Sequence, residues 1–505
     1  MFSPPKPKDS IQGTDDVKSS IGVELEFLVA IATPGQQLNI PTMVQSTNGA
    51  PLIFPSDFQQ RGEATQSRIR ETIARVVAQH RGTRIFGPDE EKQIATAVSV
   101  GGEVDGDLLH LRRYQDWTVG SDATVSLRPG DTENQEHMSE YDWKPIEVAS
   151  PPLWATEDSW EEIRRVVEAL REEYWIVTPR NAGMHVHYGH GKKYIPFGAL
   201  RRIAAFLVAV DPIIVQLHPE HRRDNDFCLS NRLYSRVAHG LPAAVISQYL
   251  GAEYVEEAPE FPRARPRPEP VSRPTFQRTE GLVVPFRRGQ LTGYTFNPET
   301  FLEIGYEVDP DDFGSADEPN PQPLEIPYAA REILRCLNAP TVANLSTHDP
   351  GDRPAYSFLN YTLDQYKRLT RSRGTLDLDS QPKRTIEFRQ MAATMDPDEV
   401  VAHGKVVVRL CEFATEADLD ELWKVILDCT VAEVDGTWYD VFDLLVELGL
   451  TPEARVLKHS VARFRGLGET VPEEVGKNEE TSTAEEKAET RSGRPRWLSV
   501  IPGFR

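Results

Sequence analysis

Polar groups alternate with apolar residues in four short segments of the chain, in a pattern typical of β-strands. These groups are Glu24 and Glu26, then Glu147, then His185 and His187, and finally Glu387 and Arg389. Residues two apart on a strand share one face, so each segment would place its polar groups on one side and its apolar side chains on the other. If the four strands lie in one sheet, the carboxylates form a cluster of negative charge that bound cations would neutralise.

The make-up of this cluster indicates which cation it would hold. Glutamate oxygens outnumber imidazole nitrogens, and such hard ligands suit Mg²⁺ or Mn²⁺ better than zinc. Magnesium held by carboxylates commonly partners nucleotide phosphates, and Arg389 offers the bidentate donors that a phosphate accepts. The chain has neither a P-loop sequence nor a usable glycine-rich dinucleotide turn. Each polar pair taken singly would equally suit a solvated strand face or a structural ion pair, so the ordered set is what favours a site.

The elements that must position these groups are strands at 21–29, 145–149, 184–188 and 384–390. The spacing of apolar residues predicts helices at 65–80, 198–217 and 398–413. A further helix is expected after Ser159, which has the spacing of a capping box with Glu162. Strands and helices mix without a regular βαβ rhythm, which favours an α+β fold with a largely antiparallel sheet.

Composition limits the class of protein. The 505 residues are 39% hydrophobic and 27% charged, as in folded globular proteins, and the net charge of -22 argues against a nucleic-acid partner. No apolar run is long enough to cross a membrane and no secretory segment is recognisable, so we expect a soluble cytoplasmic protein without a membrane partner. The four cysteines lack metal or disulfide spacing and are expected to be buried thiols. The oligomeric state is unknown from the sequence.

Proline and charge mark the boundaries of the organisation we expect. One catalytic domain would span 18–468 after a flexible segment at 1–17. It would carry a proline-rich insertion at about 256–280 and a loop at about 309–327. The acidic segment 469–505 has few apolar residues and is expected to be a disordered, solubilising tail.

The order and local form of these motifs resemble the glutamine synthetase and glutamate–cysteine ligase superfamily, and more closely the amidoligase family of fungi and bacteria. The matching segments are a G-x-E-x-E-F opening at 22–27, E-x-x-S-P-P at 147–152, H-V-H at 185–187, L-x-P-x-x-R at 217–222 and T-x-E-F-R at 385–389. The resemblance covers about 18–415, apart from the proline-rich insertion. It implies a glutamine synthetase-like half-barrel sheet lined by carboxylates, with helices on its outer face.

The resemblance also implies an activity. Such enzymes are ATP-dependent ligases that join a carboxylate to an amine, both from small molecules or peptides, through an acyl phosphate. Two Mg²⁺ or Mn²⁺ ions would bridge protein carboxylates and phosphate oxygens.

Site roles follow by position from the same resemblance. Glu24, His185 and Glu387 resemble ligands of the metal near the transferred phosphate, and Glu26 and Glu147 resemble ligands of the second metal. Arg389 resembles the phosphate-binding guanidinium, and His187 would contact the nucleotide or its phosphate. Asp122 resembles the family's D-G-S segment, although Ala123 and Thr124 replace glycine and serine. Loops at 223–330 and 340–360 are candidates to cover the site, with Arg353 as an additional phosphate contact.

Three other functions fit the same residues. One is a phosphotransferase that uses ATP but transfers phosphate to a nitrogen acceptor on the same fold. Another is a metal-dependent hydrolase, which would account for the histidines and carboxylates without ATP. The third is a binding protein that keeps the fold without turnover.

Overall fold

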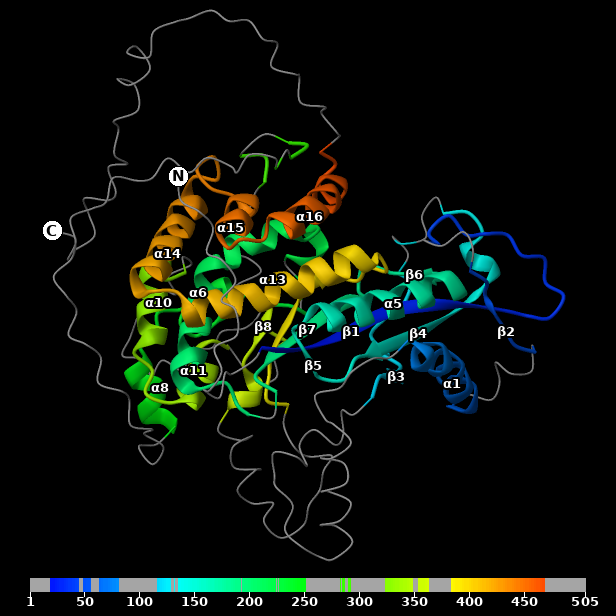
Figure 1. Ribbon diagram of the computed structural model, residues 1–505, viewed down its shortest axis with the longest axis horizontal. Helices are drawn as coiled ribbons and strands as arrows, with labels where there is room; N and C mark the ends of the chain where they lie inside the picture. The colour runs from blue at the N-terminus through cyan, green and yellow to red at the C-terminus, as the bar shows by residue number, and fades with distance from the viewer. Residues whose placement is uncertain are drawn as a thin grey trace, which may run out of the picture. The chain divides into compact units, whose positions relative to one another are not determined.

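One open, largely antiparallel sheet runs through the computed structural model (Figure 1). The structure describes residues 19–44, 49–55, 63–80, 116–128, 131, 135–191, 193–223, 225, 227–250, 282, 284–286, 289–291, 323–347, 353–362 and 383–467. Within these ranges, the main path of the sheet joins β3 (Thr118–Gly120), β4 (Asp142–Ala149), β1 (Ser20–Ala32), β7 (Gly183–Gly189), β9 (Ile386–Ala392) and β8 (Tyr356–Ser357) in that order. Three short strands pair with β1 off this path: β2 (Leu52–Ile53) in parallel, and β5 (Leu153–Trp154) and β6 (Ile176–Val177) antiparallel.

The register of three strand pairs, β1 with β4, β1 with β7 and β7 with β9, fixes which side chains lie opposite each other. Glu26 pairs with Glu147 across β1 and β4, while Glu24 pairs with His185 across β1 and β7. His187 in turn pairs with Glu387 across β7 and β9. Directly opposed residues of an antiparallel ladder point to the same face, so the polar groups of four strands share one side of the sheet.

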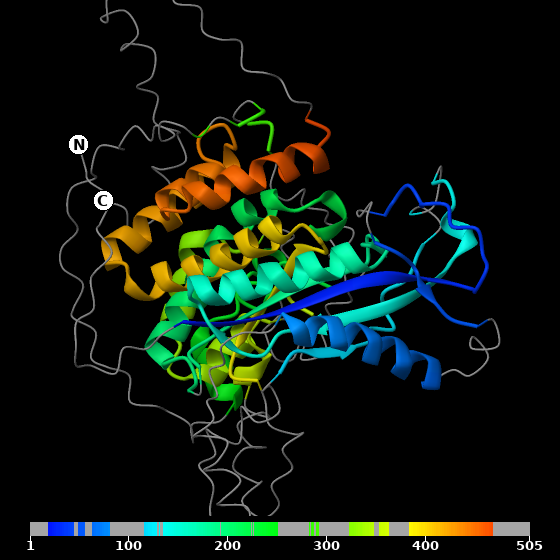
Figure 2. The ribbon, with the colours of Figure 1, turned by 45° about the vertical axis from the view of Figure 1, so that its right-hand side comes forward.

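The opposite face of the sheet is apolar and is covered by helices. Val23, Leu25 and Phe27 of β1 are fully buried there, in one core with residues of α5 (Glu157–Glu173) and α13 (Pro397–Glu416). Figures 1 and 2 show these two helices running side by side along the sheet. The alternation of apolar and polar residues between Val23 and Phe27 of β1 is therefore what separates the core from the site.

The remaining described helices pack around this pair and extend the core. The longest is α6 (Phe197–Ile214), which contacts α10 (Ile326–Leu334), α13 and α14 (Leu419–Val434). The others are α1 (Glu63–Gln79), α7 (Asn231–Tyr234), α8 (Ala243–Leu250), α11 (Ala339–Leu345), α15 (Val441–Glu447) and α16 (Thr451–Phe464). Short 3₁₀ turns lie at Met138–Glu140, Val215–Leu217, Glu220–Arg222 and Leu359–Tyr361. Among the described helices, none is long and apolar enough to cross a membrane.

Most of the expected elements are confirmed, including the α+β class, the largely antiparallel sheet, the four strands and the helices at 65–80, 198–217 and 398–413. The capping box is wrong. Helix α5 begins earlier, after Thr156, so Ser159 lies inside its first turn and is buried. The Glu162 carboxylate instead accepts a hydrogen bond of 2.7 Å from the indole nitrogen of Trp117, which is a long-range partner that local sequence does not reveal.

The expected loops are wrong in part, since residues 231–234 and 243–250 of the cover expected at 223–330 form helices α7 and α8. Residues 340–345 belong to the buried helix α11 rather than to a cover, because Asn338 caps that helix through the backbone N–H of Thr341. The end of the loop at 309–327 is likewise the first turn of α10, where Pro327 suits a position whose N–H has no helical partner. The rest of that loop up to residue 322, the insertion at 256–280, the segment 1–17 and the tail at 469–505 lie outside the described residues, so the domain boundaries stay predictions. The four cysteines are buried thiols, as expected.

Candidate active site

Six of the predicted site residues gather in a row across the polar face of the sheet. They run from Glu147 on β4, through Glu24 and Glu26 on β1 and His185 and His187 on β7, to Glu387 on β9. Glu26 and both histidines are buried, and Glu24, Glu147 and Glu387 are half-buried. Carboxylates that are withdrawn from water to this degree need partners, so their contacts define what the site can bind.

Glu24 lies at the centre of the row and has three cationic or imidazole neighbours. Its Oε1 is 2.9 Å from His187 Nε2 and 2.6 Å from Lys383 Nζ, and its Oε2 is 3.2 Å from His185 Nδ1. Burial works to raise the pKa of Glu24, but His187, His185 and Lys383 together outweigh it and hold this pKa well below its usual value. Glu24 therefore stays anionic throughout the neutral range.

Glu387 is the carboxylate at the β9 end of the row. It forms an ion pair with Arg389, two residues along β9, and its Oε1 is 3.7 Å from His185 Nδ1. Burial opposes its ionisation, yet His187, Arg389 and His185 lower the pKa of Glu387 below the ordinary value. One ligand atom each from Glu24, His187 and Glu387 lies within 4.8 Å of the others.

The other end of the row has an excess of negative charge. Glu26 Oε2 accepts a hydrogen bond of 2.7 Å from the backbone N–H of Gly183, and its Oε1 is 3.6 Å from His185 Nε2. Burial raises the pKa of Glu26. Burial, followed by the charges of Glu24 and Glu26, raises the pKa of Glu147 to about 7. Without a cation, this pair of carboxyls therefore holds a proton near neutral pH.

The donor set fits divalent cations with oxygen-rich coordination. Neighbouring ligand atoms on an octahedral Mg²⁺ or Mn²⁺ are about 3 Å apart, given bonds of about 2.1 Å. The distances from Glu24 to His187 and to His185, 2.9 and 3.2 Å, are close to that spacing. His185 faces both ends of the row, with Nδ1 toward Glu24 and Nε2 toward Glu26, so it separates two places where a cation could be held.

Asp122 and Arg353, which the sequence analysis also singled out, lie at the margin of this cluster. Asp122 accepts from the N–H and hydroxyl of Thr124, and its charge contributes to raising the pKa values of Glu26 and Glu147. The Arg353 guanidinium stacks 5.1 Å from the centre of the Phe227 ring. The Phe227 carbonyl accepts a hydrogen bond of 3.3 Å from Arg389 Nε, so Phe227 contacts both Arg353 and Arg389.

A bulge in β9 sets the direction of Arg389. The register with β7 shifts between Met184 and Val186, so that Arg389 and Gln390 together oppose the single residue His185. The buried guanidinium of Arg222 donates to the carbonyl oxygens of both bulge residues. Arg222 is the last residue of the L-x-P-x-x-R segment, for which the sequence analysis predicted no contact.

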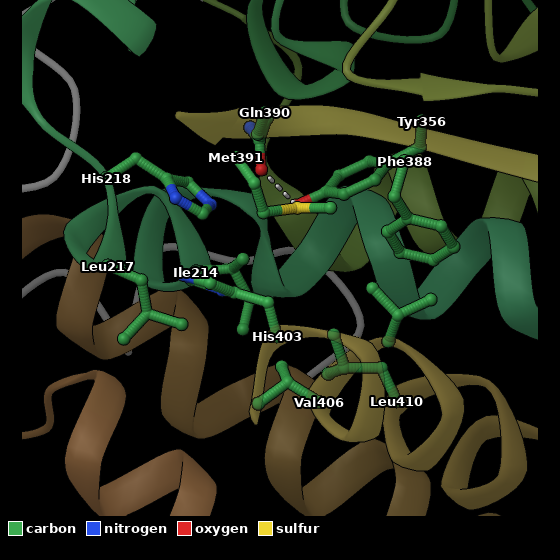
Figure 3. A pocket seen from close by; sticks show the side chains of 11 residues that line it. Ile214, Leu217, His218, Tyr356, Phe388, Gln390, Met391, His403, Val406 and Leu410 are labelled. Atoms are coloured by element: carbon green, nitrogen blue, oxygen red, sulfur yellow. Dashed lines mark hydrogen bonds between the residues drawn. The ribbon is translucent and has the colours of Figure 1, made fainter. Parts of the chain in front are cut away.

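The side chain of Gln390 is fixed on the far side of the bulge. Its amide nitrogen donates to Asp211 over 2.8 Å and its amide oxygen accepts from the Tyr356 hydroxyl over 3.0 Å. Figure 3 shows this side chain at a small apolar cavity that the imidazoles of His218 and His403 also line. The cavity lies between β9 and the helices and does not include the carboxylate row.

Sequence reasoning missed Lys383 and Thr385. Lys383 Nζ contacts Glu24, and Thr385 Oγ1 lies 3.1 Å from His187 Nδ1, where it orients the ring. The signal was present, because Lys383, Thr385, Glu387 and Arg389 follow one another at intervals of two. Extending the strand period back from Glu387 would have found both residues.

Residues 18–237 match the model of a protein family that is described as "putative amidoligase enzyme". No curated protein and no solved structure matches the chain. The matched segment contains β1, β4, β7 and Arg222, and it ends before Lys383, Glu387 and Arg389.

Proposed function

Because residues 18–237 match the amidoligase family, we propose that the protein is an ATP-dependent carboxylate–amine ligase. The observation that carries the proposal is the position of Glu387 and Arg389. They lie beyond the matched segment, yet β9 brings them beside Glu24 and His187 of that segment. Carboxylates that can hold metal ions and a guanidinium that can bind phosphate are recurring parts of phosphoryl-transfer sites.

The proposed reaction has two steps. An oxygen of the substrate carboxylate attacks the γ-phosphorus of ATP, the bond to the β-phosphate oxygen breaks, and ADP leaves with that electron pair. The amine then attacks the acyl carbon of the resulting acyl phosphate, inorganic phosphate leaves, and the amine loses a proton as the amide forms. The first step makes a poor electrophile reactive, and the second needs the acyl phosphate to be kept from water.

Individual residues have distinct roles in this proposal. Glu24, His187 and Glu387 would hold one divalent cation, so His187 takes the ligand position that the resemblance gave to His185, and His185 stays within reach. Glu26 and Glu147 would hold the second cation. Bound there, Mg²⁺ or Mn²⁺ would reduce the repulsion between the substrate carboxylate and the phosphates. Arg389, directed by the bulge, would bind the transferred phosphate through its paired N–H groups. Arg353 would be an additional phosphate contact at the margin.

We include a glutamine synthetase-like fold in the proposal. Its support is the open antiparallel sheet, which carries carboxylates on one face and helices on the other. The half-barrel curvature of that fold is part of the expectation.

The first experiment requires no knowledge of the substrates. Thermal unfolding would be followed with Mg²⁺ alone, ATP alone and both together, because a ligand that binds the native state raises its stability as RT ln(1 + [L]/Kd). The proposal expects the largest rise with Mg²⁺ and ATP together, and loss of that rise in Glu387→Gln. Glu157→Gln, which changes an exposed carboxylate on α5, is the matched control.

A screen of acid and amine pairs then separates the reactions. A ligase forms ADP and inorganic phosphate in equal amounts, and only when both substrates are present. ADP without free phosphate would instead identify a phosphotransferase to nitrogen. A response to Mn²⁺ or Zn²⁺ with none to nucleotide would favour the hydrolase and contradict the ligase.

A further inference from the structure

Lys383 lies where a cation bound to Glu24 and His187 would be expected. Its Nζ is 2.6 Å from Glu24 Oε1 and 3.3 Å from His187 Nε2, and those two ligand atoms are 2.9 Å apart. The three atoms therefore form a small triangle with the ammonium at one corner. Thr385 holds the far nitrogen of the imidazole at 3.1 Å, so the ring keeps its Nε2 directed at this corner.

A divalent cation and the ammonium of Lys383 would compete for the same electron pairs. A metal bound to Glu24 Oε1 and His187 Nε2 takes the lone pairs that face Lys383. Two positive charges this close together in a partly dry site also repel each other strongly. The divalent cation and Lys383 therefore exclude each other at this position.

We propose that Lys383 is an exchangeable counter-ion built into the chain, which holds Glu24 in the metal-free site and is expelled when a divalent cation binds. The inference rests on the cation site of the proposed function and adds a residue that the family match does not reach. Its consequence is that Lys383 lowers the affinity for free metal while it prevents an uncompensated buried carboxylate.

The surroundings of Lys383 allow it to leave, in contrast to the two arginines nearby. Its side chain is 37% exposed, and lysine carries a strongly hydrated charge on a flexible stem. Arg222 is 1% exposed and donates to two backbone carbonyl groups, so its departure would open the bulge. Arg389 is held by both Glu387 and the carbonyl of Phe227. Lys383 is the cation among these three that is least costly to displace.

The test is a titration of the metal-free full chain with Mn²⁺, followed by electron paramagnetic resonance and calorimetry, in the absence of nucleotide. The variants are Lys383→Gln, which removes the charge, and Lys383→Arg, which keeps it. Lys405→Gln is the matched control, because Lys405 pairs with Glu157 over 3.0 Å on the helical side of the sheet. We expect Lys383→Gln to bind Mn²⁺ about tenfold more tightly than the wild type, after allowance for screening of a partly exposed charge. Lys383→Arg and Lys405→Gln should stay within about twofold of it.

Thermal unfolding supplies a second readout that does not depend on activity. Lys383→Gln should melt below the wild type without metal, and saturating Mn²⁺ should remove that difference. Equal or weaker Mn²⁺ binding by a folded Lys383→Gln would overturn the inference and leave the ligase proposal intact. If neither the wild type nor any variant binds Mn²⁺, the cation site of the proposed function fails, and the inference fails with it.

Discussion

Glu26 and Glu147 stand directly opposite each other on β1 and β4, with both carboxyls on the polar face of the sheet. Like charges at such a cross-strand position destabilise a sheet. Here the two groups are also withdrawn from water, and the pKa of Glu147 rises to about 7. The two carboxyls therefore repel each other in the metal-free protein, and a cation bound between them would turn this repulsion into attraction.

The Glu147 carboxyl should make the metal-free protein less stable as the pH rises. A pKa of about 7 in the folded state, against an ordinary 4.5, means that its stabilising contribution is fully present below pH 4.5 and is lost as the pH passes 7. Because Glu147 is partly exposed, we expect a loss of only about 1–2 kcal/mol. Urea unfolding with a chelator at pH 5 and pH 8 measures it. In Glu147→Gln this part of the pH dependence of the unfolding free energy should disappear. An unchanged pH dependence would show that other groups cause it.

Glu24 and Glu26 should respond in opposite ways to the same substitution. Glu24 compensates His187, His185 and Lys383, so Glu24→Gln should destabilise the metal-free protein by about 2–3 kcal/mol. Glu26 faces Glu147, so Glu26→Gln relieves repulsion and should change stability by less than about 1 kcal/mol or raise it. Both should weaken Mn²⁺ binding. Chemical unfolding distinguishes the two cases, and equal destabilisation would contradict the charge asymmetry along the row.

Arg222 should control the site without belonging to the carboxylate row. Arg222→Met removes the donors to the carbonyls of Arg389 and Gln390, which leaves buried acceptors unsatisfied and should cost about 2–4 kcal/mol. Arg222→Lys keeps the charge but not both hydrogen bonds, and should retain only part of the stability. Arg171→Met, on the outer helix α5, is the control and should change little. If Arg222→Met keeps the wild-type stability and nucleotide response, the bulge does not need this clamp.

The buried pair His218 and His403 should limit stability in acid. Their rings lie 5.6 Å apart beside the internal cavity, and burial lowers the pKa of His403 to about 4 (Figure 3). A depressed pKa means that the contribution is present above pH 6.5 and is lost as the pH falls through 4. Unfolding at pH 7 and pH 4.5 should show a wild-type loss that exceeds that of His403→Gln by about 2 kcal/mol. The same pH sensitivity in the variant would exclude His403 as its source.

The faces of the strands were readable from the sequence, because polar and apolar residues alternate between Val23 and Phe27 in β1 and between Met184 and Tyr188 in β7. What the sequence could not show is which strands are neighbours. Glu147 and Glu387 come within reach of β1 residues only through long-range pairing. The contacts of Lys383 and Arg222 have the same origin, since each depends on a partner more than a hundred residues away. The capping box at Ser159 failed because α5 begins earlier, after Thr156, and the Glu162 carboxylate pairs with the distant Trp117.

The bulge at Arg389 and Gln390 also determines how the strands would tolerate changes in length. At this point β9 holds one residue more than the ladder needs, so loss of one residue there can be absorbed while Phe388 still meets Val186 and Met391 still meets Met184. By contrast, β1 pairs with β4 and with β7 in an unbroken register and has no extra residue. A single insertion or deletion there would turn Glu24 into the core and an apolar neighbour into the site. Strand pairing alone would therefore tolerate the loss of one residue at the bulge in β9 but not in β1, although a loss at the bulge would remove the contacts that Arg222 makes there.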